Sequence, residues 1–164
     1  MPVAKRTCYD LAVVEASDLV GAWRLDDWTI AYDDGRPSTH PFGDDARGML
    51  IYAAEGVMSV SVTRAERVKL SGENVRVVPE AERAAAFDTY FAYAGRWRLE
   101  SGQMIHEVDQ ALNPNFVGAA LARRIEHRGN QLILSAAQRT ASGATMDNRL
   151  TWRRVGGDDD AGRT

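Results

Sequence analysis

His106 is the side chain in this sequence best suited to acid–base chemistry near neutral pH. It lies in segment 103–110, where Met104, His106, Val108 and Gln110 alternate with mostly polar residues. Because the side chains of a strand alternate between its two faces, this pattern predicts that His106 and Gln110 point inward. An imidazole has an unperturbed pKa of about 6.5, so His106 is a candidate general acid or base. A hydrogen-bonded structural histidine is the alternative.

Tyr93 is a second candidate, in the alternating segment 91–99. It shares a face with Phe91 and Trp97, which predicts that its hydroxyl lies inside the fold. There it could donate a proton or a hydrogen bond to a ligand, or simply be a buried core tyrosine. Tyr90, next to the end of the preceding helical segment, could close the entrance of a pocket.

Arg123 has the same phase as Leu121 and Ile125 in segment 118–127. An inward guanidinium needs a carboxylate, a ligand oxyanion or water to offset its desolvation. An internal ion pair and a side chain that reaches the barrel mouth are both open alternatives. Arg124 is expected to face solvent.

Asp27 is the acidic candidate. In segment 21–32, Trp23 sets the inward phase, which Asp27 follows, whereas Trp28 falls on the outward face. A desolvated carboxyl has a raised pKa and can act as a base. A bulge at Asp26-Asp27 would instead turn both acids to water.

Further residues in the same phase, or in adjoining loops, are expected to contact a ligand. His40 belongs to the long charged loop 33–47, and Phe116 to the loop motif Asn113–Phe116. The ligand-contact candidates are Trp97, Phe91, Gln110, Met58, Tyr90, His40 and Phe116.

Short alternating segments separated by turn residues must position these side chains. Asp34-Gly35 and Ser101-Gly102 supply the positive φ values that tight hairpins need. Residues 79–87 begin with proline, acids and alanines, which predicts a short helix, and 13–19 contains a helix-like turn. About eight antiparallel strands can close into a barrel that is filled by side chains or holds one small ligand. The predicted strands are 21–32, 48–53, 57–63, 91–99, 103–110, 118–127, 131–138 and 147–155.

Composition bounds the class of protein. The 164 residues carry a formal net charge of −3, which gives no electrostatic reason to expect nucleic acid as a partner. One domain is expected over 11–155, followed by a disordered acidic tail over 156–164. The chain shows no signal peptide and no membrane-spanning run, so a cytoplasmic protein is expected, and its state as monomer or homodimer stays open. Cys8 is the single cysteine, which excludes an internal disulfide.

Known cofactor and metal motifs are missing from the sequence. The histidines at 40, 106 and 127 have no metal-ligand spacing. There is no phosphate-binding Gly-rich loop, no dinucleotide fingerprint and no Gly-x-Ser-x-Gly elbow. We therefore expect no metal and no cofactor.

Several motifs resemble one family. Gly21-Ala22-Trp23 opens the first predicted strand, and Trp152 and Arg154 lie in the last. The other matching stretches are His40–Asp45, Gly48–Tyr52, Met58–Val60 and Asn113–Gly118. From about Leu19 to Val155 the chain resembles a bacterial and fungal lipocalin-like domain family. The resemblance implies a β-barrel whose floor is closed by Trp23, with Arg154 packed over its ring; it implies no particular activity, because the family shares no single one.

Two functions fit these residues. The leading hypothesis is a cofactor-independent enzyme, an isomerase, cyclase or dehydratase, that holds an apolar, carbonyl-containing secondary metabolite such as a polyketide inside the barrel. His106 or Asp27, with Tyr93 and Arg123, would supply its acid–base chemistry. The alternative is a non-catalytic protein that binds a small hydrophobic ligand through the same side chains. A filled barrel that serves as an interaction module would have no ligand-sized cavity.

Overall fold

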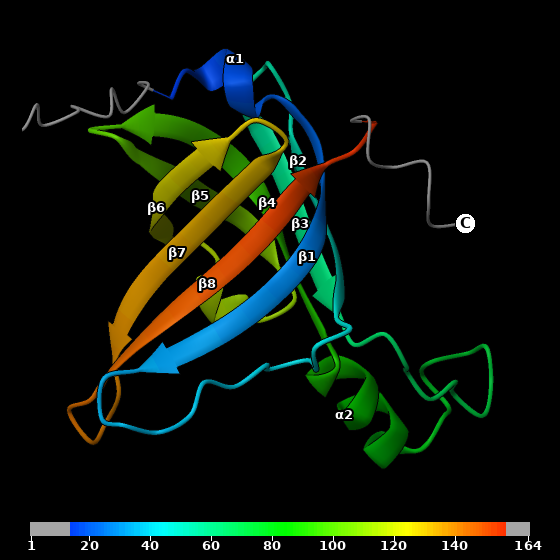
Figure 1. Ribbon diagram of the computed structural model, residues 1–164. Coiled ribbons are helices and arrows are strands. Elements are labelled where there is room, and N and C mark those ends of the chain that lie inside the picture. The colour runs from blue at the N-terminus through cyan, green and yellow to red at the C-terminus, as the bar shows by residue number, and fades with distance from the viewer. Residues whose placement is uncertain (1–13, 157–164) are drawn as a thin grey trace, which may run out of the picture.

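Eight antiparallel strands close into one barrel in the computed structural model, which describes residues 14–156 (Figure 1). Each strand pairs with its neighbours in the chain, and β8 closes the barrel against β1. The expected all-β, lipocalin-like architecture is thereby confirmed. Cys8 and residues 157–164 of the expected tail lie outside the described residues. The strands are β1 Gly21–Tyr32, β2 Arg47–Tyr52, β3 Val57–Thr63, β4 Tyr90–Glu100, β5 Gln103–Ala111, β6 Ala120–Arg128, β7 Gln131–Arg139 and β8 Thr145–Arg154.

The helices lie at the two ends of the barrel. The four-residue helix α1 (Ala16–Leu19) covers one end, and α2 (Glu80–Asp88) lies beside the other, outside the sheet (Figure 1). A 3₁₀ turn, η1 (Pro114–Phe116), joins β5 to β6 and begins with an Asn113 side chain that accepts a hydrogen bond from the Asn115 amide at 3.1 Å. Both predicted helical segments are thus present. None of the helices in residues 14–156 is long and apolar enough to cross a bilayer.

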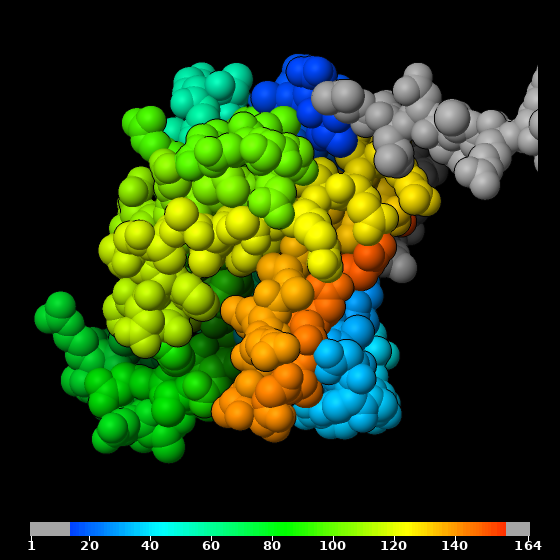
Figure 2. All heavy atoms as spheres, turned by 90° about the vertical axis from the view of Figure 1, so that its left-hand side faces the viewer, coloured from blue at the N-terminus to red at the C-terminus, as the bar shows by residue number. Residues whose placement is uncertain are grey.

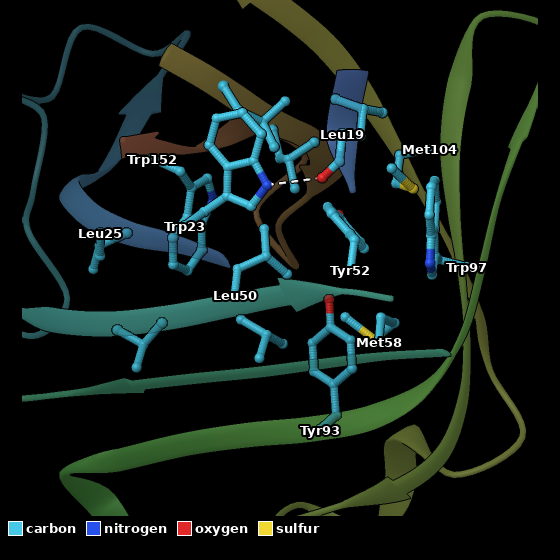
Figure 3. Packing of buried hydrophobic residues seen from close by; sticks show 14 of the residues in the cluster. Leu19, Trp23, Leu25, Leu50, Tyr52, Met58, Tyr93, Trp97, Met104 and Trp152 are labelled. Carbon is cyan, nitrogen blue, oxygen red and sulfur yellow. Dashed lines mark hydrogen bonds between the residues drawn. The ribbon is translucent and has the colours of Figure 1, made fainter. Parts of the chain in front are cut away.

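The end of the barrel beneath α1 is filled by buried side chains, and we refer to these residues as the floor. Trp23 is fully buried, and its indole Nε1 donates a hydrogen bond to the Leu19 carbonyl at 2.9 Å (Figure 3). Arg154 lies with its guanidinium 4.1 Å above the Trp23 ring, as the family resemblance implied, and donates to the Val20 carbonyl. Such cation–π contacts are worth about 0.5–2 kcal/mol. The floor residues are Leu19, Trp23, Met58, Trp97 and Met104.

Gly21, the first residue of β1, is a position where the backbone conformation and the nearby Arg154 side chain favour glycine. Its φ of +133° is a conformation that L side chains rarely adopt, and a Cβ there would lie 2.9 Å from the Arg154 guanidinium. The glycine two residues before Trp23 therefore makes room for the arginine that covers the indole.

A bulge in β1 reverses the direction of the side chains beyond it. Leu25 pairs with Trp152, but Asp27 pairs with the next residue of β8, Thr151, so Asp26 is the extra residue. Asp27 consequently faces outward and Trp28 inward. The bulge at Asp26-Asp27, which the sequence left open as the alternative, is therefore present, and the predictions that Asp27 points into the barrel and that Trp28 points out of it are wrong.

A second bulge lies in β5, where this strand pairs with β4. Gly95 pairs with Val108 while Ala94 pairs with Gln110, which leaves Asp109 as the extra residue. A Cβ on Gly95 would lie 1.9 Å from the Glu107 carbonyl oxygen, so only glycine fits this close approach. Gln110 is turned to the outer face, and the prediction that it points inward is wrong.

Candidate functional site: a cavity inside the barrel

A cavity of about 210 Å³ occupies the barrel beyond the floor. Every strand contributes to its wall, and most of the wall is aromatic or aliphatic. Its polar side chains are a tyrosine, a histidine, an arginine and two amides. The lining residues are Trp28, Leu50, Val60, Phe91, Tyr93, His106, Phe116, Leu121, Arg123, Leu134, Ala136, Gln138, Asn148, Leu150 and Trp152.

The cavity reaches the side of the barrel where β6 and β7 separate. These strands pair only between 124–128 and 131–135, so the first residues of β6 and the last of β7 have no partner in each other. Leu121 and Arg123 line the cavity from β6, and Ala136 and Gln138 from β7. Figure 2 faces this side and shows the surface hollowed between the yellow-green segment that leads into β6 and the orange strand β7. A small molecule could enter here.

His106 is held between two tyrosines. Its Nε2 lies 2.6 Å from the Tyr52 hydroxyl and its Nδ1 lies 2.6 Å from the Tyr93 hydroxyl. The three side chains come from β2, β5 and β4, and all are almost completely buried. His106 and Tyr93 line the cavity, while Tyr52 lies behind them against the Trp97 ring, at 4.8 Å between centroids.

Burial controls the protonation of this chain of hydrogen bonds. Desolvation, and secondly the positive charge of Arg123, lower the pKa of His106 to about 3. Burial also raises the pKa of Tyr52 and of Tyr93, an effect that the charge of Arg123 partly offsets. At neutral pH the imidazole and both phenols are therefore uncharged.

Arg123 is the cation of the cavity. Its Nη1 donates to the Ala122 carbonyl at 3.1 Å, and its positive charge partly offsets the rise that burial causes in the pKa of Tyr93. Within residues 14–156 no carboxylate lies within ion-pair distance of it. Its neighbour Arg124, by contrast, faces outward and binds Asp147 at 2.6 Å. Of the two sequence alternatives for Arg123, the internal ion pair is absent from residues 14–156, and the side chain lines the cavity.

Aromatic rings form one part of the cavity wall, and Trp28 belongs to it because the bulge in β1 turns this side chain inward. Trp28 lies 6.1 Å from the Phe91 ring, and Phe91 lies 6.0 Å from Phe116 in an edge-to-face contact. The Trp28 indole donates to the Asn148 side-chain oxygen at 3.5 Å. The wall thus combines flat apolar surfaces with a few placed hydrogen-bonding groups, as small-molecule sites do.

A family model described as a lipocalin-like domain matches residues 20–155. The chain belongs to this lipocalin-like family. It is also 29% identical over 107 residues to the 4'-hydroxy-3'-methoxypropiophenone carrier protein ppsC of Aspergillus oryzae, a match that covers 60% of this chain and 96% of that protein. No solved structure matches the chain.

The lipocalin-like cavity brings together five of the residues predicted from the sequence. Four of them lie in strands, and their inward phase was predicted correctly because no extra residue separates them from the apolar residues that set the phase; Phe116 was predicted from its loop motif. The five are His106, Tyr93, Arg123, Phe91 and Phe116.

The other predicted contacts lie elsewhere. Met58 and Trp97 point inward but belong to the floor, where the Trp97 indole donates to the Ala53 carbonyl at 2.9 Å. Tyr90 lies on the outer side of β4, under the Arg67 guanidinium. His40 is exposed, with its Nδ1 3.8 Å from Asp27, and neither side chain lines the cavity.

Sequence reasoning missed Tyr52, Trp28 and Asn148. Tyr52 shares the phase of Leu50 in β2, so alternation was enough to find it. Trp28 could be assigned to the cavity only once the bulge in β1 was known, and Asn148 lies in a strand whose polar residues gave no inward pattern.

Among residues 14–156 no three histidine, cysteine or acidic side chains are grouped to hold a metal ion.

Proposed function

We propose that this barrel binds one small aromatic molecule in the cavity, with the ring against the apolar wall and its oxygen atoms toward Tyr93 and Arg123. The cavity itself carries the proposal. Its 210 Å³ is smaller than the roughly 300–1,000 Å³ of sites for drug-sized ligands, yet larger than an engineered apolar cavity of about 150 Å³ that binds benzene. That size suits a single ring with short substituents and argues against a filled barrel.

The similar protein ppsC supports the same class of ligand. Its name describes a carrier of 4'-hydroxy-3'-methoxypropiophenone, an aryl ketone with one ring and several oxygen atoms. This combination of a flat apolar body and polar ends matches a wall with Phe91 and Trp28 on one part and Tyr93 and Arg123 on another.

A titration with this ketone tests the proposal. Binding is followed by calorimetry and by tryptophan fluorescence, to which Trp28 and Trp152 contribute from the cavity wall. Ala136→Phe fills the cavity from β7 and should weaken binding by at least about tenfold, which corresponds to ~1.4 kcal/mol. Ala137→Phe places the same ring at the neighbouring exposed position and should bind like the natural chain. Equal effects of the two variants, or no binding by the natural chain, would contradict the proposal.

A second candidate function is proton transfer to or from the bound ketone. It is favoured by the Tyr52–His106–Tyr93 hydrogen bonds, which end at the cavity wall. Such an enzyme would exchange the hydrogens next to the ketone carbonyl with deuterium from heavy water, and Tyr93→Phe would slow that exchange by about 10²-fold or more. Binding without accelerated exchange would leave the carrier function alone.

A further inference from the structure

The hydrogen bond between Tyr52 and His106 determines whether Tyr93 donates to His106 or accepts from it. Tyr52 is fully buried, and in the described part of the chain its hydroxyl has His106 Nε2 as its one hydrogen-bond partner. A buried O–H without an acceptor is costly, so Tyr52 donates to Nε2. The neutral imidazole then carries its hydrogen on Nδ1 and donates it to the Tyr93 oxygen.

Tyr93 is left with one unused group. Its oxygen accepts from His106 Nδ1, which is its one hydrogen-bond partner among residues 14–156. A hydroxyl both accepts and donates hydrogen bonds, so the O–H of Tyr93 remains free. Arg123 lines the same cavity, and its positive charge acts on the Tyr93 hydroxyl. Because Tyr93 lines the cavity, that O–H is available to a bound molecule.

The charge of the cavity points the same way. Arg123 contributes the positive charge of the wall, and the lining contains no aspartate or glutamate. The side chains that line the cavity from β1, β3, β7 and β8 are uncharged. Besides Arg123, the titratable groups at the cavity are His106 and Tyr93 in its wall and Tyr52 behind them. The wall therefore offers hydrogen-bond donors beside a cation without a carboxylate.

We propose that Tyr93 Oη and the Arg123 guanidinium form an oxyanion site, which binds an oxygen that carries or gains negative charge, as in a phenolate or the enolate of an aryl ketone. The inference rests on the proposed function, because it names the chemistry of the ligand in the same cavity. It predicts that the cavity prefers the ionised form of a phenol to the neutral form. Donors directed at such an oxygen in a site of low dielectric favour its charged form.

The probe is 4-hydroxyacetophenone, whose phenol and phenolate differ in absorbance, titrated with pH when free and when bound. The expected result is that binding lowers the pKa of the probe by about one, which corresponds to ~tenfold tighter binding of the phenolate. Arg123→Gln should abolish the shift, and Tyr93→Phe should reduce it. Arg124→Gln is the matched control, because that arginine is paired with Asp147 outside the barrel, and it should keep the full shift.

A neutral probe of similar size, 4-methoxyacetophenone, separates charge recognition from packing. It should bind the natural chain and the Arg123→Gln variant within about twofold of each other. The oxyanion site is overturned if the bound phenol keeps the pKa of the free one, or if Arg123→Gln weakens both probes equally. If neither probe binds the natural chain, the proposed function fails as well. Near-ultraviolet circular dichroism shows whether each variant keeps the barrel packing.

Discussion

The two ends of the barrel are built in opposite ways. At the floor, Trp23, Leu19 and Met104 are completely buried, and Arg154 holds the first and last strands together over the indole. In the cavity half, β6 and β7 separate, and the wall includes partly exposed side chains such as Trp28. Of the residues that carry the family resemblance, Trp23 and Arg154 close the floor, whereas Leu50, Val60, Phe116 and Trp152 line the cavity. His106, Tyr93 and Arg123, the candidate polar groups of the cavity, lie outside the matching stretches.

The largest expected difference is between two tryptophans of the same strand. Trp23→Ala empties the floor and should lower the free energy of unfolding by about 3–5 kcal/mol. Trp28→Ala removes a partly exposed ring beside an existing cavity and should cost only about 1–2 kcal/mol, while weakening ligand binding. Urea unfolding of both variants checks the comparison. Equal losses of stability would show that the cavity half is packed as tightly as the floor.

Acid should act on the cavity half through His106. Below pH 6.5 the unfolded chain binds a proton at this imidazole, whereas the folded protein does so only near pH 3. Stability therefore falls as the pH falls between these values, by up to about 1.4 kcal/mol per pH unit. His106→Gln cannot titrate and its amide can still bond to both tyrosines, so its unfolding free energy should depend less on pH. Parallel pH profiles of the two proteins would contradict the burial of a neutral His106.

The smallest effect concerns two adjacent arginines of β8. Arg154→Gln loses the contact with Trp23 and should lower the free energy of unfolding by about 1–2 kcal/mol. Arg153 is exposed and pairs with Asp26 at 2.8 Å, so Arg153→Gln should cost no more than about 0.5 kcal/mol. Thermal unfolding of the pair measures the difference. An equal cost for both would mean that the covering arginine contributes no more than a surface ion pair.

The sequence was sufficient to predict where the strands lie, but not to predict which face of a strand every side chain occupies. All eight predicted strands are present, because turn residues and alternation mark them directly. For Asp27 the sequence left an inward side chain and a bulge at Asp26-Asp27 both open, and the structure has the bulge. Gln110 was predicted on the wrong face because alternation simply continues through the extra residue Asp109. Gly95 offered a signal for the second bulge, because a glycine inside a strand often marks a close backbone approach.

Depth along the barrel was beyond the reach of alternation. Trp97 and Tyr93 share one face of β4, yet Trp97 packs in the floor and Tyr93 lines the cavity. The two residues lie four positions apart along β4, so they occupy different depths of the barrel although they share a face. Alternation identifies the face of a strand and not which of its ends lies at the floor.

In the proposed complex a small aromatic molecule occupies the cavity with its oxygen near Tyr93 and Arg123. The most direct test is nuclear magnetic resonance of the protein with 4'-hydroxy-3'-methoxypropiophenone, recording contacts between ligand protons and protein methyl groups. We expect contacts to Leu121, Leu134 and Leu150 of the cavity wall. Contacts to outward side chains such as Met49 and Ile51 instead, or to no methyl group at all, would show that the cavity is not the binding site.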